Sequence, residues 1–114
     1  MSRDIIAIEL DTTVREAISK MEQHHIHELP VMQNSTLKGW VNYDTLIQRA
    51  HVPAAAKATS VMVPGSRIAQ TADLITAADT MIRQNVRAVA VVDTKGQIVG
   101  ILSRTDLIRA AADV

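Results

Sequence analysis

The sequence of 114 residues contains no cysteine and no phenylalanine, and it has only one tryptophan and one tyrosine. Without cysteine there is no disulfide framework and no thiolate metal site, which fits a reducing compartment. Twelve Lys and Arg residues balance twelve Asp and Glu residues. General nucleic-acid binding is therefore disfavoured, because it draws on positive charge and on aromatic rings that stack with bases.

Long apolar runs are also missing. The longest run, Ala88–Val92, is far shorter than the roughly 20 residues of a membrane-spanning helix, and no leading segment resembles a signal peptide. We expect a cytoplasmic protein, or the cytoplasmic portion of a membrane protein, in which this portion makes no membrane contact. A chain of this length can bury about two-thirds of its unfolded surface and fold without disulfide bonds or structural metal ions.

A stretch of sequence occurs twice. Residues 14–47 recur as residues 74–108, with a spacing of 60 positions up to Val31 and of 61 from Gly39 onward. The change of spacing predicts one residue more or less in a tight turn. A duplication of this period makes the repeat the unit of the fold, and two copies packed face to face favour a binding architecture over a catalytic one.

Hydrophobic periodicity predicts strand, helix, strand, strand, helix in each repeat. Thr13 and Glu16 form a capping-box pattern, and Asp73 occupies the position of the second repeat that is equivalent to Thr13. The predicted apolar stripes of the first helices are Val14, Ala17, Ile18 and Met21, and Leu74, Ala77, Ala78, Met81 and Ile82. The predicted strands are residues 5–8, 28–32, 37–41, 68–69, 88–92 and 98–102, and the second helices are residues 44–50 and 104–111. The predicted division is residues 1–50, a linker at 51–60, and residues 61–114.

Three segments resemble one known family. Val61-Met62-Val63-Pro64 is similar to its lead-in to a repeat, and residues 86–93 and 100–107 are similar to its two signature strands. The whole chain resembles a tandem pair of cystathionine-β-synthase (CBS) domains, also called a Bateman module. The resemblance implies an α/β fold of two pseudo-symmetric β-α-β-β-α repeats packed through their sheets. It also implies a homodimeric regulatory module with no catalysis and no required cofactor, which binds AMP, ADP, ATP or S-adenosylmethionine between the repeats.

Ser103 and Asp106 are the most specific pair of candidate ligand-binding residues in the sequence. In the family, this pair holds the ribose, and an ionised carboxylate is a suitable acceptor for the two hydroxyl donors of a ribose diol. A serine followed three residues later by an acid is also a common way to begin a helix, so both interpretations stay open. Arg87 matches an arginine that contacts phosphate in some relatives, and Arg104 is a second candidate contact. The apolar slot for the base would be formed by Ile68, Ala88 and Val89.

The first repeat lacks this pattern. Asn42 and Thr45 occupy the positions of Ser103 and Asp106, so we expect one competent site near Asp106 and an altered one near Thr45. His27 is the counterpart of Arg87 and could meet an anion when protonated.

Metal binding and catalysis are disfavoured. His24, His25, His27 and His51 lack the carboxylate or thiolate that would complete a tetrahedral set. No phosphate-binding glycine loop or nucleophile elbow is present either, so we expect no enzyme.

Two functions remain open. The first is an adenosine-ligand sensor that controls an attached or partner domain. The second is a ligand-free dimerisation module in which Ser103 and Asp106 only begin a helix. Residues 52–64 are similar to the linker of CBS pairs at the C-terminus of site-2-type membrane zinc metalloproteases, although no HExxH motif occurs. Channels and transporters are alternative hosts.

Overall fold

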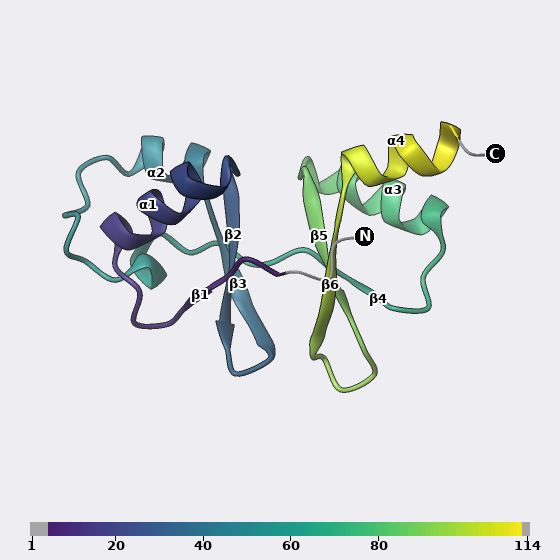
Figure 1. Cartoon of the computed structure of the whole chain (residues 1–114), viewed down its shortest axis with the longest axis horizontal. Coiled ribbons are helices and arrows are strands. Elements are labelled where there is room, and N and C mark those ends of the chain that lie inside the picture. The colour runs from purple at the N-terminus through teal and green to yellow at the C-terminus, as the bar shows by residue number, and fades with distance from the viewer. Residues whose placement is uncertain (1–4, 113–114) are drawn as a thin grey trace. The chain divides into compact units, whose positions relative to one another are not determined.

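The order strand, helix, strand, strand, helix occurs twice in the computed structural model, which describes residues 5–112 (Figure 1). The first set is β1 (Ile8–Glu9), α1 (Val14–His24), β2 (Glu28–Gln33), β3 (Thr36–Asn42) and α2 (Tyr43–Gln48). The second set, which follows the 3-10 helix η1 (Ala58–Val61), is β4 (Arg67–Ala69), α3 (Leu74–Gln84), β5 (Ala88–Val92), β6 (Ile98–Ser103) and α4 (Arg104–Ala112). The α/β fold class predicted from the sequence is confirmed.

Each set forms its own three-stranded sheet. In the orders β1-β2-β3 and β4-β5-β6, the first pair of strands is parallel and the second pair is an antiparallel hairpin. Both hairpins shift register at the same place, after Val31 and after Val91. The pairing then resumes at Leu37 in the first hairpin and at Ile98 in the second, which makes the second turn one residue longer. The predicted one-residue difference between the repeats is therefore confirmed.

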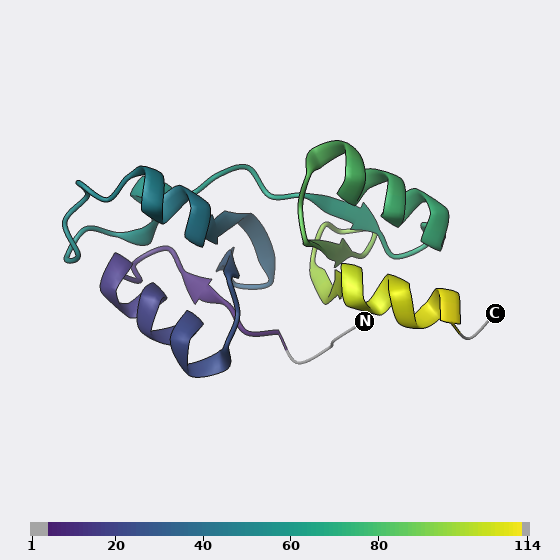
Figure 2. The same cartoon turned by 90° about the horizontal axis from the view of Figure 1, so that it is seen from above.

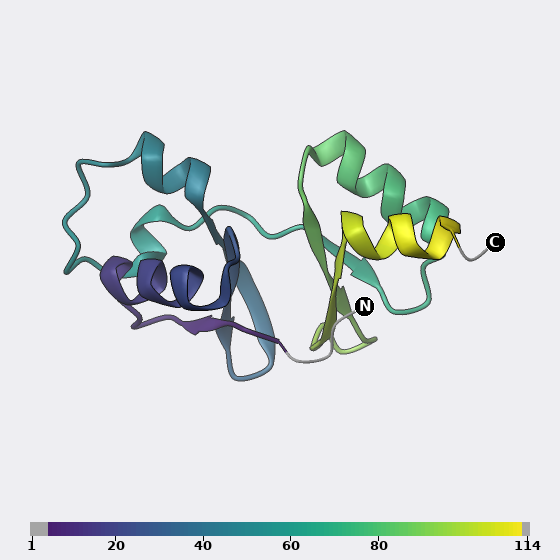
Figure 3. The same ribbon diagram turned by 45° about the horizontal axis from the view of Figure 1, so that its top comes forward.

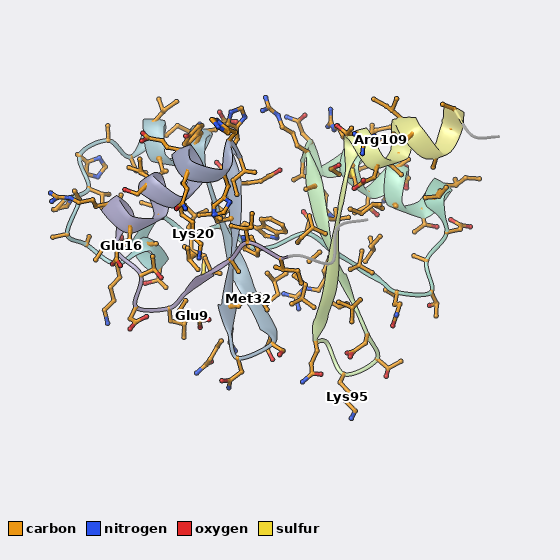
Figure 4. All side chains as sticks on the ribbon, viewed as in Figure 1. Glu9, Glu16, Lys20, Met32, Lys95 and Arg109 are labelled. Atoms are coloured by element: carbon orange, nitrogen blue, oxygen red, sulfur yellow. The ribbon has the colours of Figure 1, made fainter. Side chains whose placement is uncertain are left out.

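The longer turn lies at the end of the β5–β6 hairpin, where Figure 4 shows Lys95 at the tip. The Asp93 carboxylate accepts hydrogen bonds from the backbone N–H groups of Lys95 and Gln97, each at 2.9 Å. Gly96 has a φ of 78°, a conformation that side chains with a Cβ rarely adopt. The turn chemistry thus fixes the hairpin register.

The first helix of each repeat begins and ends in the same way. The Thr13 hydroxyl accepts from the Glu16 N–H at 3.1 Å, and the Glu16 carboxylate accepts from the Thr13 N–H at 3.1 Å, which is the predicted capping box. Asp73 begins α3 by accepting from the backbone N–H of Thr76 at 2.8 Å. The helices end at His25 and Asn85, whose φ values are 54° and 53°.

The chain divides by packing into a first unit, Ile6–Gly65, and a second unit that contains Ile5 and the residues from Ser66 onward. The segment after α2 belongs to the first unit, because it turns back to the start of α1 (Figure 3). Carbonyl groups of Ala56 and Ala54 accept from the first two N–H groups of α1, at 2.8 and 3.0 Å. Ala58 and Val61 are fully buried in the core of this unit. The buried core is Ile8, Val14, Ala17, Met21, Leu29, Val31, Val41, Ala58 and Val61.

The second unit has a smaller core. In Figure 2 helices α3 and α4 lie side by side, and the sheet contributes the strands beneath them. The buried core is Ile68, Ala77, Met81, Val89, Val91 and Leu102. Leu74 and Ile82, two members of the predicted stripe, have exposed fractions of 50 % and 71 %. The stripe of α3 is therefore buried only in part. In the first unit, η1 packs into the core beside Val14, the counterpart of Leu74, and the core of the second unit has no such helix.

Candidate functional site

The junction between β6 and α4 holds the pair that the sequence singled out. The Ser103 N–H and hydroxyl both lie at hydrogen-bond distance from Oδ2 of Asp106, at 2.8 and 3.0 Å. In return the Asp106 N–H donates to the Ser103 hydroxyl at 3.2 Å. The two half-buried side chains therefore form a capping box at the start of α4. The capping interpretation is confirmed, and it is compatible with ligand binding because a carboxylate can accept about four hydrogen bonds.

The charge of this carboxylate is favoured by its surroundings. Partial burial raises the pKa of Asp106, but the interactions that lower it, first among them the hydrogen bonds from the Ser103 N–H and hydroxyl, outweigh burial together, so the net shift is below the ordinary value. Asp106 is therefore ionised at neutral pH. An ionised carboxylate at a helix start also interacts favourably with the helix dipole.

Arg104 and Arg87 lie beside this pair. The Arg104 N–H donates to the Arg87 carbonyl at 3.0 Å, which joins the start of α4 to the residue before β5. The Arg104 Nε donates to the Val86 carbonyl at 2.9 Å, and its Nη2 lies 3.5 Å from the Met81 carbonyl. Its guanidinium group thus holds the end of α3, a structural role that was not predicted from the sequence. The Arg87 side chain is exposed.

The three residues predicted to form an apolar slot do not share one surface. Ala88 pairs with Ser103 in the β5–β6 ladder, so it lies next to the capping pair. Val89 points to the other face of the sheet, because strand residues alternate. It is fully buried in the core of the second unit, and Ile68 belongs to the same core. Of the three residues, the structure brings only Ala88 beside Ser103.

The equivalent junction in the first unit is built differently. The Asn42 side-chain oxygen accepts from the Thr45 N–H at 2.8 Å, and Thr45 is buried. The Tyr43 N–H donates to the His27 carbonyl at 3.0 Å, and the two rings lie 5.0 Å apart between centroids. Tyr43 and His27 thus stand where Arg104 and Arg87 stand in the second unit. In this junction the amide of Asn42 replaces the Ser103 hydroxyl, and the buried Thr45 stands in the place of the Asp106 carboxylate.

The histidines and carboxylates of residues 5–112 do not gather into a cluster of metal ligands. Among residues 5–112 no three His, Cys, Asp or Glu side chains come close enough to hold a metal ion.

Trp40 is 6 % exposed, and its indole N–H has no hydrogen-bond partner in the part of the chain described. Its ring lies against Gly65, where an added Cβ would be 2.5 Å from Cδ1 of Trp40. The tight enclosure of this ring was not predicted from the sequence.

A duplicated β-α-β-β-α unit with a capped junction after its last strand defines a class of small tandem-repeat modules. The sequence matches the CBS domain family over residues 1–51 and 59–113, and the chain belongs to that family. It is 29 % identical over 123 residues to a CBS domain-containing protein of Dictyostelium discoideum, a match that covers 95 % of this chain and 85 % of the relative.

Solved structures show the same fold. The complex of CBSX2 with AMP has a TM-score of 0.88 and 24 % identity, covering 99 % of this chain and 92 % of the other. The CBS domain of a bacterial CNNM/CorC family Mg²⁺ transporter in complex with ATP has a TM-score of 0.83 and 20 % identity, covering 98 % and 82 %. No helix within residues 5–112 has the length and apolar composition that crossing a membrane requires.

Proposed function

We propose that this chain is a regulatory module that binds an adenosine-containing ligand through Ser103 and Asp106. The observation that carries the proposal is the ionised, half-buried carboxylate at the β6–α4 junction, held in place by two hydrogen bonds from Ser103. A carboxylate in this setting can accept both hydroxyls of a ribose diol, and such charge-assisted hydrogen bonds contribute about 1.5–3 kcal/mol each. The AMP and ATP complexes of the structural neighbours support the ligand class.

The remaining site residues have unequal roles in this proposal. Arg87, exposed before β5, is the candidate for a phosphate contact, because a guanidinium group presents a planar fork to phosphate oxygens. Arg104 contributes by positioning the start of α4, since its side chain is bonded to carbonyl groups of the protein. Ala88 offers an apolar surface beside Ser103, while Val89 and Ile68 support it from the core.

The module has no catalytic role in this proposal. It acts as a homodimer in the cytoplasm, and ligand occupancy biases an effector domain that is fused to it or bound as a partner. Regulation of this kind requires the ligand to bind two states of the module with different affinities. In this proposal AMP, ADP, ATP or S-adenosylmethionine is a regulatory ligand and not a required cofactor.

The second candidate function is a dimerisation module without a ligand. It is favoured by the completed capping box, because Ser103 and Asp106 already have a structural task, and by the exposed isoleucines of α3. The same module could belong to a membrane metalloprotease, a channel or a transporter. The two candidates differ in one measurable property, which is affinity for nucleotides.

Isothermal titration calorimetry against AMP, ADP, ATP, S-adenosylmethionine and NAD tests the proposal. We expect at least one of these ligands to bind, and the 2′,3′-dideoxy analogue of the best nucleotide to bind far more weakly because it lacks both hydroxyls. Equal affinity for the dideoxy analogue would refute the ribose contact. If no ligand binds, the dimerisation module is the better description.

A further inference from the structure

The hairpin that joins β2 to β3 turns on two exposed residues, Asn34 and Ser35 (Figure 1). Gln33 pairs with Thr36 across the hairpin, so only these two residues form the loop. Asn34 has a φ of 56°, whereas Ser35 is not among the residues with a positive φ. In a two-residue loop, a positive φ at the first residue alone defines a type II′ turn. Glycine is the usual residue at that position, and this chain has an asparagine there.

The turn gives Asn34 a backbone conformation that favours an intramolecular reaction. A type II′ turn is the mirror image of a type II turn, so the ψ of its first residue is about −120°. At this ψ the backbone nitrogen of Ser35 lies on the same side of the Cα–C bond as Cβ of Asn34. The nitrogen can then approach Cγ of the side-chain amide with little further backbone rotation, and closure of the two groups gives a five-membered succinimide ring.

Neither reacting group is held by the rest of the protein. Among residues 5–112 no hydrogen bond engages the Asn34 side chain or the Ser35 N–H. Both residues are exposed, so solvent can accept the proton of the attacking nitrogen and water can reach the ring. The site therefore combines a nucleophile and an electrophile that are both accessible.

The other two asparagines of the chain lack this combination. Asn42 has a ψ of 162°, and its side-chain oxygen accepts a hydrogen bond from the Thr45 N–H at 2.8 Å. Asn85, at the end of α3, has a ψ of 46°. The residue after it is Val86, whose branched side chain crowds the nitrogen that would attack. These two asparagines serve as internal references for the reactivity of Asn34.

We propose that Asn34 is a site of spontaneous deamidation through a succinimide. The Ser35 nitrogen loses its proton and forms a bond to Cγ of Asn34, while the bond from Cγ to the side-chain nitrogen breaks and ammonia leaves. Water then opens the ring at one of its two carbonyl carbons. One opening gives aspartate, and the other gives isoaspartate, in which the main chain runs through Cβ. The reaction consumes one water and releases one ammonia, and it needs no enzyme, cofactor or oxidant.

The reaction changes both the charge and the length of the loop. Either product places a carboxylate at the end of the hairpin and lowers the formal net charge of +0 by one. Isoaspartate also adds a backbone carbon to a two-residue loop whose length fixes the register of the hairpin. The hairpin supplies Leu29, Val31 and Val41 to the core of the first unit. We therefore expect the isoaspartyl chain to be less stable, whether or not the module binds a nucleotide.

Peptide mapping by mass spectrometry tests the site, because trypsin places the three asparagines in separate peptides, residues 21–38, 39–49 and 84–87. At mildly alkaline pH we expect Asn34 to react about 5- to 30-fold faster in the folded chain than in a peptide of residues 32–37, the factor that prior ordering of one residue contributes. The products should include isoaspartate, which direct hydrolysis of the amide does not form. Asn42 and Asn85 should remain intact over the same time. A folded chain that reacts no faster than the peptide, or that yields aspartate alone, would overturn the inference.

A double variant separates the effect of backbone conformation from that of sequence. Thr94→Asn with Lys95→Ser places the same Asn-Ser dipeptide in the exposed turn of the β5–β6 hairpin, where neither position has a positive φ. The N–H of position 95 donates to the Asp93 carboxylate at 2.9 Å, which holds the attacking nitrogen away from the new side chain. We expect the asparagine at position 94 to react more slowly than Asn34 by a similar factor. Equal rates would show that the dipeptide alone determines reactivity and would refute the role of the turn.

Thermal melting of aged protein tests the consequence. Asn34→Gly removes the reacting amide and suits the first position of a type II′ turn, so it is the control that cannot deamidate. After incubation the unaltered chain should show a population with a lower melting temperature, in proportion to its isoaspartate content, and aged Asn34→Gly should melt as it does when fresh. An aged unaltered chain that contains isoaspartate and melts like fresh protein would refute the predicted loss of stability.

Discussion

Replacing Asp106 by asparagine separates the two tasks assigned to this side chain. Asp106→Asn keeps the shape of the side chain and removes its charge, and an asparagine in that place can still accept one hydrogen bond from Ser103. In the structure the carboxylate accepts from the Ser103 N–H at 2.8 Å and from its hydroxyl at 3.0 Å. We expect the loss of the charge-assisted part of these bonds to destabilise the fold by about 0.5–1 kcal/mol, within the range of helix caps.

The effect on binding should be larger. If the carboxylate holds a ribose diol, the loss of its charge removes about 2–3 kcal/mol from the binding free energy. The dissociation constant should then rise about 30- to 150-fold. Asp73→Asn is the matched control, because Asp73 begins α3 in the same unit and accepts from the Thr76 N–H at 2.8 Å. It should change stability without changing affinity.

The assay combines calorimetry for affinity with thermal melting for stability, both at pH 7. A folded Asp106→Asn variant that binds AMP or ATP as tightly as the unaltered chain would refute the assigned ribose contact. Equal losses of affinity in Asp106→Asn and Asp73→Asn would show that binding follows stability. Because both outcomes are read on folded protein, unfolding cannot be mistaken for loss of the site.

Three further predictions concern the scaffold and its pH dependence. Gly39→Ala should destabilise the chain by about 1–3 kcal/mol in urea unfolding, because the added Cβ would lie 2.7 Å from the Val63 carbonyl oxygen. Gly96→Ala, whose added Cβ meets open space at a φ of 78°, should lower the free energy of unfolding by only about 1 kcal/mol. The reverse order of the two effects would contradict the structure. Arg104→Ala removes the bond to the Val86 carbonyl and should speed hydrogen exchange at the end of α3; unchanged exchange would count against this role. The pKa of Asp106 is lowered in the folded state, so its contribution to stability is present above about pH 4 and is lost as the pH falls through the folded-state pKa. The difference in melting temperature between the unaltered chain and Asp106→Asn should therefore be constant from pH 8 to about pH 5 and shrink below about pH 4. A difference that already shrinks near pH 6 would refute this prediction.

Local chemistry made most of the fold predictable from the sequence. The strand Ala88–Val92 has the predicted bounds, and the other hairpin strands differ by at most one residue at either end. Thr13 and Asp73 begin their helices as predicted because a cap depends only on residues within one turn. The first strand is the exception. It was predicted at residues 5–8 and is observed at Ile8–Glu9, because its extent is set by pairing with β2, a long-range contact.

Packing between distant segments could not be predicted. Periodicity predicted an apolar stripe on both α1 and α3, but it did not predict that Ala58 and Val61 would pack into the core with Val14. The position of Arg104 in the sequence suggested a ligand contact, and its bond to Val86 depends on how α4 and the end of α3 meet. Periodicity describes which face of a helix is apolar, and tertiary contacts decide what covers that face.

The two strand-to-helix junctions show how a duplicated fold can keep one structure and divide its chemistry. Both junctions satisfy the first N–H groups of a helix, one with Asn42 and one with Ser103. An amide does this without charge, so the cap alone does not require a carboxylate at Asp106. The carboxylate adds a charge whose burial is unfavourable, and the hydrogen bonds from Ser103 are among the interactions that lower its pKa. If α4 needed only a cap, an asparagine like that of the first unit would suffice. The retained charge is therefore the part of the junction that a ligand with hydroxyl donors would use, and Asp106→Asn removes that part while leaving a cap in place.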